Sequence, residues 1–542
     1  MDRQGCYCLL QARNGEKVPA LVPSQGEPRP LHSMIDPRRE AQKLVSTLGD
    51  DTGFIVFLGL GGGFAVEEAL KNTAVRVLVI EFNKDDIELL FSLKDYSPLL
   101  KNERFHLLID PSTEEIKNFI ATAYRPALFG GIKTIPLRTR IEADFSKFDN
   151  AAKALSAAIE NVSGDYSVQA HFGKRWFSNI IRNLKAAENQ AENLHAFDAV
   201  NEAAIVAAGP SLDMQITAVK ECKSRKAFII CCDTALPVLL RRGIEPDAVV
   251  SIDCQHISYY HFMGCNMREN KSRIPLFLDI ASPPLLCGFS NSPVFFSSAH
   301  PLALYISQYW RPLPLLDTSG GNVTYAGLSL AENLGAKHIT LFGADFSYVK
   351  SSSYARGTYI FPFFEKKQNR LTPAESLFSA FLYRSPFLPR DIEDRKKNFY
   401  ETSQLRFYRE KLEEKAAAMD AQILSAPGMG APINLPQKTA RNTEGGASAF
   451  LKKRSVIQGQ HGGLDSEAFL KQYSADIESL PPGADNYLSA LNEKDALVFT
   501  TLLPLAAAFK HREAKLKTRD LINIVKEFCV KEIEKVLAGL YS

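Results

Sequence analysis

The sequence lacks most of the features that mark a specialised structural class. No C-x-x-C pair occurs among its nine cysteines, so neither a zinc ribbon nor a thioredoxin-like motif is predicted. A formal charge of +3 over 542 residues gives no basic footprint for nucleic acid. No repeat of solenoid period is present. With 45% hydrophobic and 23% charged residues, the composition is typical of a globular protein and excludes a mainly disordered chain.

Long apolar runs are also missing. The longest, residues 496–509, contains two threonines and Pro504, and at about 14 residues it is too short to span a bilayer, so it predicts a buried helix. Residues 1–8 have no apolar stretch of the kind found in a signal peptide. Cys231 and Cys232 are vicinal within an apolar run, which favours free thiols. We therefore expect a cytoplasmic protein without a membrane span.

Apolar strands alternate with helical stretches in two blocks of the chain, which predicts parallel sheets and a multidomain α/β fold. The expected strands are 54–59, 75–81 and 105–110 in the first block, and 203–208, 227–231, 248–253, 275–280, 294–297, 314–316 and 338–342 in the second. The predicted divisions are an N-terminal Rossmann-like domain (1–147), a helical connector (148–196), a central Rossmann-type domain (197–436), a linker (437–464) and a helical C-terminal domain (465–542).

A first glycine cluster stands between a predicted strand and a helix. Gly59, Gly61 and Gly63 have no Cβ, so the backbone can approach a ligand, and the helix N-terminus favours an anion. Glu81 ends the next strand, where a carboxylate can accept from ribose hydroxyls. The same pattern fits a tight crossover without a ligand. These four residues are a secondary candidate site.

A second cluster begins with Gly209, Pro210 and Ser211, which follow a strand and open a helix in the manner of a phosphate-binding turn. Asp233 and Asp253 end the next two strands in the same sense. Because the carboxyl ends of parallel strands lie on one edge of the sheet, we expect these groups to meet in one pocket. Asp233 is equally well explained as a helix cap, whereas Asp253 has no comparably clear helix to cap.

A third cluster precedes the expected helix 323–334. Ser319, Gly320 and Asn322 suit a phosphate or a nucleobase amide, and Asp345 follows the last predicted strand. The segment after it, residues 347–364, carries three tyrosines: Tyr348, Tyr354 and Tyr359. Two interpretations of that segment stay open, a lid with phenolic donors and aromatic packing under a long loop.

Several stretches resemble the motility accessory factor (Maf) flagellin glycosyltransferase family. They are AIVAAGPSLD, CCDTALPVLLRRGIEPDAVVSID and SGGNVTYAGLSLAENLGAKHITLFGADFSY, preceded by LHSMIDPRREA, FLGLGGGF…VIEF and KRWFSNIIRNL. The likeness covers most of residues 30–430. The central domain is also similar to bacterial sialyltransferases and to archaeal 6-hydroxymethylpterin diphosphokinase MptE-like proteins.

The resemblance implies transfer of a nonulosonic acid, of pseudaminic or legionaminic type, from a CMP-activated donor to Ser or Thr of flagellin. The implied reaction requires no cofactor beyond this donor, and a role for Mg²⁺ stays open. It implies that Gly209, Pro210 and Ser211 hold the nucleotide phosphate, Asp233 lies near the ribose or base, Ser319, Gly320 and Asn322 close over the nucleotide, and Asp253 and Asp345 line the donor and acceptor cleft.

The chain departs from the sialyltransferase pattern at one point. That family has a catalytic histidine late in the domain, but no histidine occurs here between His338 and His461. The nearest replacements for the general base are Asp345, Tyr400 and Glu401.

Two alternatives remain from the sequence. One is diphosphate transfer from ATP with Mg²⁺, in which Asp233, Asp253 and Asp345 would be oxygen ligands of the metal. The other is a flagellin-binding factor without catalytic activity. The C-terminal helices would then form its partner surface.

Overall fold

The computed structural model describes residues 6–23, 26–49, 51–188, 199–263, 265, 274–388, 399–438, 464–484 and 487–540. The chain forms two compact units, Met1–Lys174 with Asp476–Val530, and Arg175–Ala475 with Lys531–Ser542. Most of the predicted linker 437–464, and residues 189–196 of the predicted connector, lie outside the described residues. The five-part division stays a prediction, since the two units are defined by contacts that join segments distant in sequence.

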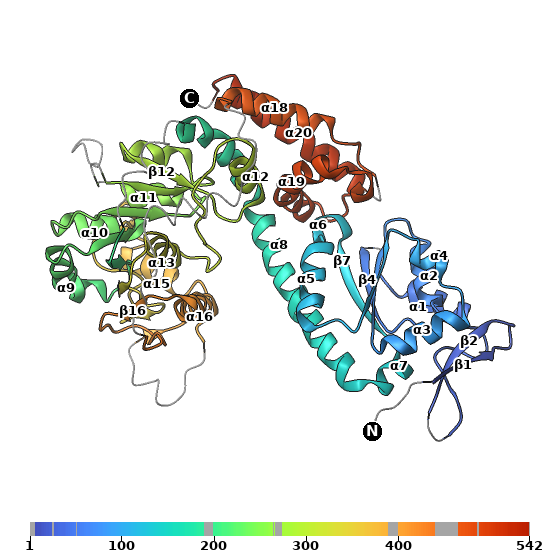
Figure 1. The fold of residues 1–542 in the computed structure, drawn as a ribbon. Coiled ribbons are helices and arrows are strands. Elements are labelled where there is room, and N and C mark those ends of the chain that lie inside the picture. Colours follow the sequence, from blue (N-terminus) through green and yellow to red (C-terminus); the bar gives the residue numbers. More distant parts are fainter. Residues whose placement is uncertain are drawn as a thin grey trace. The chain divides into compact units, whose positions relative to one another are not determined.

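The first unit contains a parallel sheet of order β6-β5-β4-β7 (Figure 1, blue). Its strands β4 (Thr52–Leu58), β5 (Arg76–Glu81) and β6 (Phe105–Ile109) match the three strands expected here. The sequence did not predict β7 (Gly131–Pro136), because its half-exposed edge carries polar residues. The smaller antiparallel sheet comprises β1 (Cys6–Gln11), β2 (Lys17–Val22) and β3 (Arg29–Pro30).

Helices of this unit follow ordinary capping rules. In α1 (Pro37–Ser46), the Asp36 carboxylate accepts from the backbone N–H groups of Arg38 and Arg39, which satisfies donors that have no partner inside the helix. The other helices before the long connector are α2 (Phe64–Leu70), α3 (Lys84–Leu93), α4 (Ser97–Leu100), α5 (Thr113–Ala123), α6 (Pro126–Phe129) and α7 (Arg138–Ala143).

The connector is one 44-residue helix, α8 (Phe145–Glu188), so the predicted helical segment is confirmed as far as Glu188. Apolar residues in the C-terminal half of this helix are buried, with Ile180 and Leu184 both 0% exposed. A Cβ on Gly173 would lie 1.9 Å from the Pro504 carbonyl oxygen. Only glycine therefore allows α8 to approach α19 (Glu493–Arg512) this closely.

The C-terminal region is helical, as predicted. It contains α18 (Ser466–Ser479), the 3₁₀ turn Tyr487–Ala490, α19 and α20 (Thr518–Leu537). The apolar run 496–509 is part of α19, and Leu502 and Ala506 within it are fully buried, which confirms the buried helix. Within the described ranges, no helix is both long enough and apolar enough to cross a membrane.

The second unit is built on a seven-stranded parallel sheet of order β12-β11-β10-β9-β8-β13-β16 (Figure 1, green and yellow). The strands are β8 (Glu202–Val206), β9 (Phe228–Cys232), β10 (Ala248–Ser251), β11 (Leu276–Asp279), β12 (Pro293–Phe296), β13 (His338–Phe342) and β16 (Gln422–Ser425). The expected strand 314–316 is wrong: only a single bridge joins Leu315 to Ser297. Pro314 has no N–H to extend a ladder.

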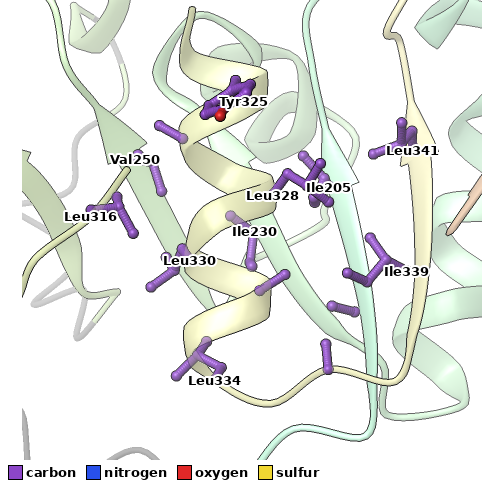
Figure 2. Close-up of a cluster of buried hydrophobic side chains, with 14 of the residues drawn as sticks. Ile205, Ile230, Val250, Leu316, Tyr325, Leu328, Leu330, Leu334, Ile339 and Leu341 are labelled. Atoms are coloured by element: carbon purple, nitrogen blue, oxygen red, sulfur yellow. The ribbon is translucent and has the colours of Figure 1, made fainter. Parts of the chain in front are cut away.

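Helices surround this sheet and bury its apolar strands. Figure 2 shows Leu328 of α13 (Val323–Asn333) beside Ile205 of the sheet, with Leu330 on the side of Leu316 and Val250. The other elements are α9 (Leu212–Ser224), the 3₁₀ turn Asp233–Ala235, α10 (Leu236–Arg241), α11 (Ile257–Phe262), the 3₁₀ helix Pro284–Phe289, α12 (Pro301–Tyr309), β14 (Tyr348–Val349), α14 (Ile360–Lys367), α15 (Ala374–Leu382), β15 (Phe399–Tyr400) and α16 (Ser403–Ala418).

Candidate functional site

The order of the central sheet identifies the place where a ligand is expected. From β8 the chain proceeds through β9 to β12 on one side, and then returns to place β13 and β16 on the other. Ligands of open α/β sheets bind beyond the carboxyl ends of the strands, next to such a reversal. The turn Gly209-Pro210-Ser211 follows β8, and Asp345 follows β13, so the sequence placed both at this edge.

In the structure, the protein's own groups fill this turn. The Ser211 N–H donates to Asp345 Oδ2 at 2.7 Å, and the Ser211 hydroxyl accepts from the Met429 N–H at 2.8 Å. A Cβ on Gly209 would lie 2.4 Å from Asp345 Oδ2. Burial raises the pKa of Asp345, while the bond from Ser211 opposes that rise. A phosphate on this turn would have to displace Asp345, so the phosphate-binding role of these residues stays a prediction.

Ser211→Ala tests how far the turn serves the fold. Ser211 is 1% exposed, and its loss leaves the Met429 N–H without its acceptor, which is expected to lower the free energy of unfolding by about 1–2 kcal/mol. Urea denaturation measures the change. Ser224→Ala, at the exposed end of α9, is the matched control and should change stability by less than about 0.5 kcal/mol. Equal stability of both variants would show that the turn needs no hydroxyl acceptor.

The second group at this edge is a buried carboxylate paired with a histidine that the sequence reasoning missed. Asp233 is 0% exposed, and its Oδ2 lies 3.2 Å from His261 Nδ1 and accepts from the Ser251 hydroxyl at 2.6 Å. The Thr234 N–H donates to Asp233 Oδ1 at 2.6 Å. Burial alone would raise the pKa of Asp233, but the His261 imidazole and these hydrogen bonds outweigh it and lower the pKa. Asp233 is thus fully occupied by neighbouring groups.

Asp253 is the more open carboxylate. It lies two residues beyond β10, where its Oδ1 accepts from the Gln255 N–H at 2.9 Å. Burial raises the pKa of Asp253, and the negative charge of Asp233 adds to that rise. Its side chain is partly exposed and retains acceptor capacity for a ligand hydroxyl.

The tyrosine-bearing segment 347–359 is held across the same edge. The Ala355 N–H donates to the Ala208 carbonyl at 2.9 Å, directly beyond β8, and Arg241 donates to the Gly357 carbonyl at 3.0 Å. Tyr359 packs on His261 with ring centroids 4.6 Å apart. Burial raises the pKa of Tyr359 to about 12, with Arg384 opposing the rise and Asp233 and Asp253 adding to it. The phenol therefore stays a hydrogen-bond donor at neutral pH.

Arg384 is a second group that the sequence reasoning missed. Its guanidinium lies over the Phe381 ring at 4.0 Å and is close enough to Tyr354 and Tyr359 to affect the pKa of both. Arg384 is exposed, and it makes no ion pair with any residue in the described part of the chain. A guanidinium beside two phenols suits an anionic ligand. Because Arg384 follows α15 without a recognisable motif, no sequence signal indicated it.

The third predicted cluster forms an ordered turn at the start of α13. Asn322 caps that helix by accepting from the Tyr325 N–H at 3.0 Å. A Cβ on Gly320 would lie 2.1 Å from the Tyr325 ring, so this glycine is required by packing. The Ser319 hydroxyl contacts Tyr325 Oη at 3.2 Å. Thr324, in the first turn, lies 3.9 Å from Cys232 Sγ, which brings this turn to the end of β9 beside Asp233.

The residues expected to replace the missing base lie in other surroundings. Tyr400 pairs with Tyr348 across the β14–β15 ladder. Glu401 forms ion pairs with Arg406 at 3.3 Å and Arg409 at 3.1 Å. Two cations already neutralise Glu401, so it is poorly suited to accept a proton. Base catalysis by Tyr400, Glu401 or Asp345 stays a prediction without a supporting contact.

The N-terminal glycine cluster is packed by the protein itself. The Gly62 N–H donates to His32 Nε2 at 2.7 Å, and a Cβ on Gly61 would lie 2.4 Å from the same nitrogen. Glu81 accepts from the Leu60 N–H at 2.6 Å and pairs with Arg140 at 3.0 Å. Gly59 and Gly63 have φ values of 104° and 75°, which glycine adopts without strain. Of the two interpretations of this cluster, a ligand site or a tight strand–helix crossover without a ligand, these contacts favour the crossover.

Asp279, at the end of β11, is expected to make the stability of the protein depend on pH. Asp279, 5% exposed at the end of β11, accepts from the Ala281 N–H at 2.8 Å, and burial raises its pKa to about 6. The folded protein therefore holds this proton more tightly than the unfolded chain does. The stability it contributes is fully present below pH 3.8 and is lost as the pH rises through about 6. Asp279→Asn should stabilise the protein by about 2–3 kcal/mol at pH 7 and by little at pH 4. Urea denaturation at both pH values measures this, and an equal effect at both would refute the shift.

The aspartates at this edge do not form the ligand set that the Mg²⁺ of the diphosphokinase alternative needs. Across the described ranges, no group of three or more His, Cys, Asp or Glu side chains could hold a metal ion. The three aspartates of that alternative have different partners. Asp345 accepts from the Ser211 N–H, Asp233 is paired with His261, and Asp253 accepts from the Gln255 N–H. These residues do not fit a shared metal.

The protein thus has two parallel sheets covered by helices. Polar side chains gather at the carboxyl edge of the second sheet, among them Asp233, Asp253 and Asp345. The fold of the protein matches the structure of a Maf glycosyltransferase from Magnetospirillum magneticum AMB-1, with a TM-score of 0.55 and 16% sequence identity over 99% of this chain and 91% of that one. The family model described as 6-hydroxymethylpterin diphosphokinase MptE-like matches residues 177–351. Both findings confirm the resemblance seen in the sequence: a Maf-type fold that contains an MptE-like region.

Sequence relatives come from Treponema pallidum (strain Nichols), and each is an uncharacterised protein. One is 33% identical over 187 residues, which is 33% of this chain and 88% of the relative. A second is 43% identical over 18% of this chain and 34% of the relative, and a third 23% identical over 48% and 56%. Because the first identity spans most of the relative, the chain belongs to one family with that protein.

Proposed function

We propose that this protein is a glycosyltransferase that moves a nonulosonic acid from its CMP-activated donor to Ser or Thr of flagellin. The observation that carries the proposal is the match of 99% of the chain to a Maf glycosyltransferase fold. The substrate class rests on the sequence motifs that resemble that family. We also propose that the protein is cytoplasmic, because its free cysteines would stay reduced there.

The polar edge of the second unit supports the chemistry. Loss of CMP builds negative charge on the departing phosphate, so fixed donors near it lower the barrier. Tyr354, Tyr359 and Arg384 supply such donors on one segment of the fold. We assign Asp253 to the ribose hydroxyl groups of the CMP-activated donor, and the turn Ser319–Asn322 to the rest of the nucleotide.

The diphosphokinase alternative receives less support. It needs several carboxylates around one metal, and the three aspartates at this edge are engaged with different partners. The family model matches 177–351, which leaves the whole first unit without a role in a small pterin kinase. A non-catalytic flagellin-binding factor is disfavoured by the concentration of buried polar groups at the sheet edge.

The test is a transfer assay with the full-length protein, a CMP-activated nonulosonic acid and purified flagellin. The proposal predicts that flagellin gains the mass of one or more sugar residues and that CMP is released in equal amount. Intact-protein mass spectrometry measures the first and chromatography the second. Release of AMP from ATP with a hydroxymethyl pterin, and no sugar on flagellin, would refute the proposal.

A further inference from the structure

We propose that His261 is the general base that accepts the proton of the acceptor hydroxyl, and that Asp233 is its positioning residue. The inference rests on the proposed glycosyl transfer and names a residue for the step that the sequence left without one. It is carried by a contact between a buried carboxylate and an imidazole at the carboxyl edge of the central sheet.

The contact fixes the imidazole in one orientation. His261 lies on α11 and Asp233 on the turn after β9, and Nδ1 faces Oδ2 at 3.2 Å. The Ser251 hydroxyl holds that same oxygen at 2.6 Å, while Thr234 binds the other. A carboxylate on Nδ1 favours the tautomer with the proton on that nitrogen, which leaves the Nε2 lone pair free to accept a proton.

The free nitrogen is available for that role. His261 Nε2 makes no hydrogen bond with the described residues. It is also not one of the fully enclosed polar atoms in the described part of the chain. Nε2 therefore keeps some exposed surface, although the residue as a whole is only 8% exposed. An open nitrogen on a buried, oriented ring is the arrangement expected of a base.

The groups around His261 can stabilise the imidazolium that forms when the ring accepts a proton. His261 lies close enough to Asp233 and Asp253 to act on the pKa of both carboxyl groups by lowering it, and Tyr359 packs on its ring. Thr234 Oγ1 lies 3.3 Å from Nδ1, and the Cys265 thiol donates to the His261 carbonyl. Arg384 is the cation beside Tyr359. Two nearby negative charges stabilise the imidazolium that forms during proton transfer.

Proton transfer to His261 accompanies the exchange of bonds at the anomeric carbon. The acceptor hydroxyl oxygen forms a bond to the anomeric carbon of the sugar, and its proton passes to His261 Nε2. The bond from that carbon to the phosphate oxygen breaks, and its electron pair leaves with CMP. The imidazolium then returns the proton to water, and no oxidant, reductant or metal enters the balance.

Competing bases at this edge are less suitable. The pKa of Tyr359 is raised to about 12 by burial, so its phenol gives up its proton only in strong alkali. Asp345 already accepts from Ser211, and Glu401 pairs with two arginines. A neutral imidazole whose second ring nitrogen is free can accept a proton directly, which is the role of a general base.

The kinetic test compares His261→Gln with His256→Gln. His256 is an exposed histidine at the start of the same helix and is the matched control. His261→Gln should lower kcat for transfer by about 10²–10⁴-fold and abolish the acid limb of its pH profile, while KM for the donor and CMP affinity change less than about threefold. Asp233→Asn should lower kcat as well, because the amide favours the other tautomer. His256→Gln should retain wild-type kcat.

A second readout separates this inference from the proposed function. The imidazole nitrogen shifts of ¹⁵N-histidine-labelled protein, assigned with His261→Gln, report the tautomer without any substrate. The inference predicts a neutral His261 with its proton on Nδ1. A proton on Nε2, or wild-type kcat in His261→Gln, would overturn the inference. Absence of transfer by the wild-type protein would instead refute the proposed function, and the nitrogen shifts would still decide how Asp233 orients the ring.

Discussion

Glu81→Gln is expected to lower the free energy of unfolding of the first unit by about 1.5–3 kcal/mol. Glu81 and Arg140 both have 0% exposed side chains, with Glu81 Oε2 3.0 Å from Arg140 Nε. Removing the carboxylate leaves the buried guanidinium with Asp144 as its remaining anionic partner and with its bond to the Phe82 carbonyl at 2.7 Å, so its charge is only partly compensated. Urea unfolding followed by hydrogen exchange in the β4–β7 sheet measures the loss.

The control for this prediction is Glu88→Gln. Glu88 is 66% exposed and lies 3.7 Å from Lys84 on the surface of α3, so its loss should cost less than about 0.5 kcal/mol. Replacing both buried partners, Glu81→Leu with Arg140→Met, should recover much of the stability lost in Glu81→Gln. If Glu81→Gln were as stable as wild type but had lost affinity for a nucleotide, the carboxylate would be a ligand group and the packing account of this glycine cluster would fail.

Asp253→Asn is expected to weaken CMP binding by about tenfold to a hundredfold and to leave stability unchanged or slightly increased. A charged hydrogen-bond acceptor contributes about 1.5–3 kcal/mol to binding, which corresponds to that range. Burial raises the pKa of Asp253, so the fold gains little from its charge, and an asparagine oxygen can still accept from the Gln255 N–H. Titration calorimetry with CMP measures the affinity.

Asp247→Asn is the matched control for Asp253→Asn. Asp247 immediately precedes β10, at the opposite end of the strand, where it pairs with Lys223 at 2.6 Å and accepts from the Ile229 N–H at 2.8 Å. The variant should lose a little stability and no CMP affinity. Equal affinity of wild type and Asp253→Asn would remove Asp253 from the binding site.

Much of the fold could be predicted because its strands are continuous apolar runs. The strand His338–Phe342 was predicted at its observed bounds, and the three strands of the first block were located within a few residues. Strand β16 was missed, since the sequence QILS is short and half-exposed at the sheet edge. Leu315 was assigned to a strand on apolar content alone, although its neighbouring prolines prevent a ladder.

The candidate site was predictable only where local motifs carry it. Asp233, Asp253 and the turn before α13 stand at strand and helix ends, so their convergence follows from parallel topology. His261 could not be selected, because its pairing with Asp233 depends on how α11 packs on the sheet. The hydrogen bond from the Ser211 N–H to Asp345 could not be predicted either, since these residues are 134 positions apart in the sequence. Packing decides such contacts, and no periodicity in the sequence encodes them.

The most direct test of the account is a thermal-shift comparison of CMP, CDP, ATP with Mg²⁺, and S-adenosylmethionine on wild type and Asp253→Asn. A ligand that binds the folded protein raises its apparent stability according to occupancy. The account predicts a rise with CMP for wild type, a much smaller rise for Asp253→Asn, and none with ATP and Mg²⁺. A rise with ATP and Mg²⁺ alone would contradict glycosyl transfer and indicate diphosphate transfer instead.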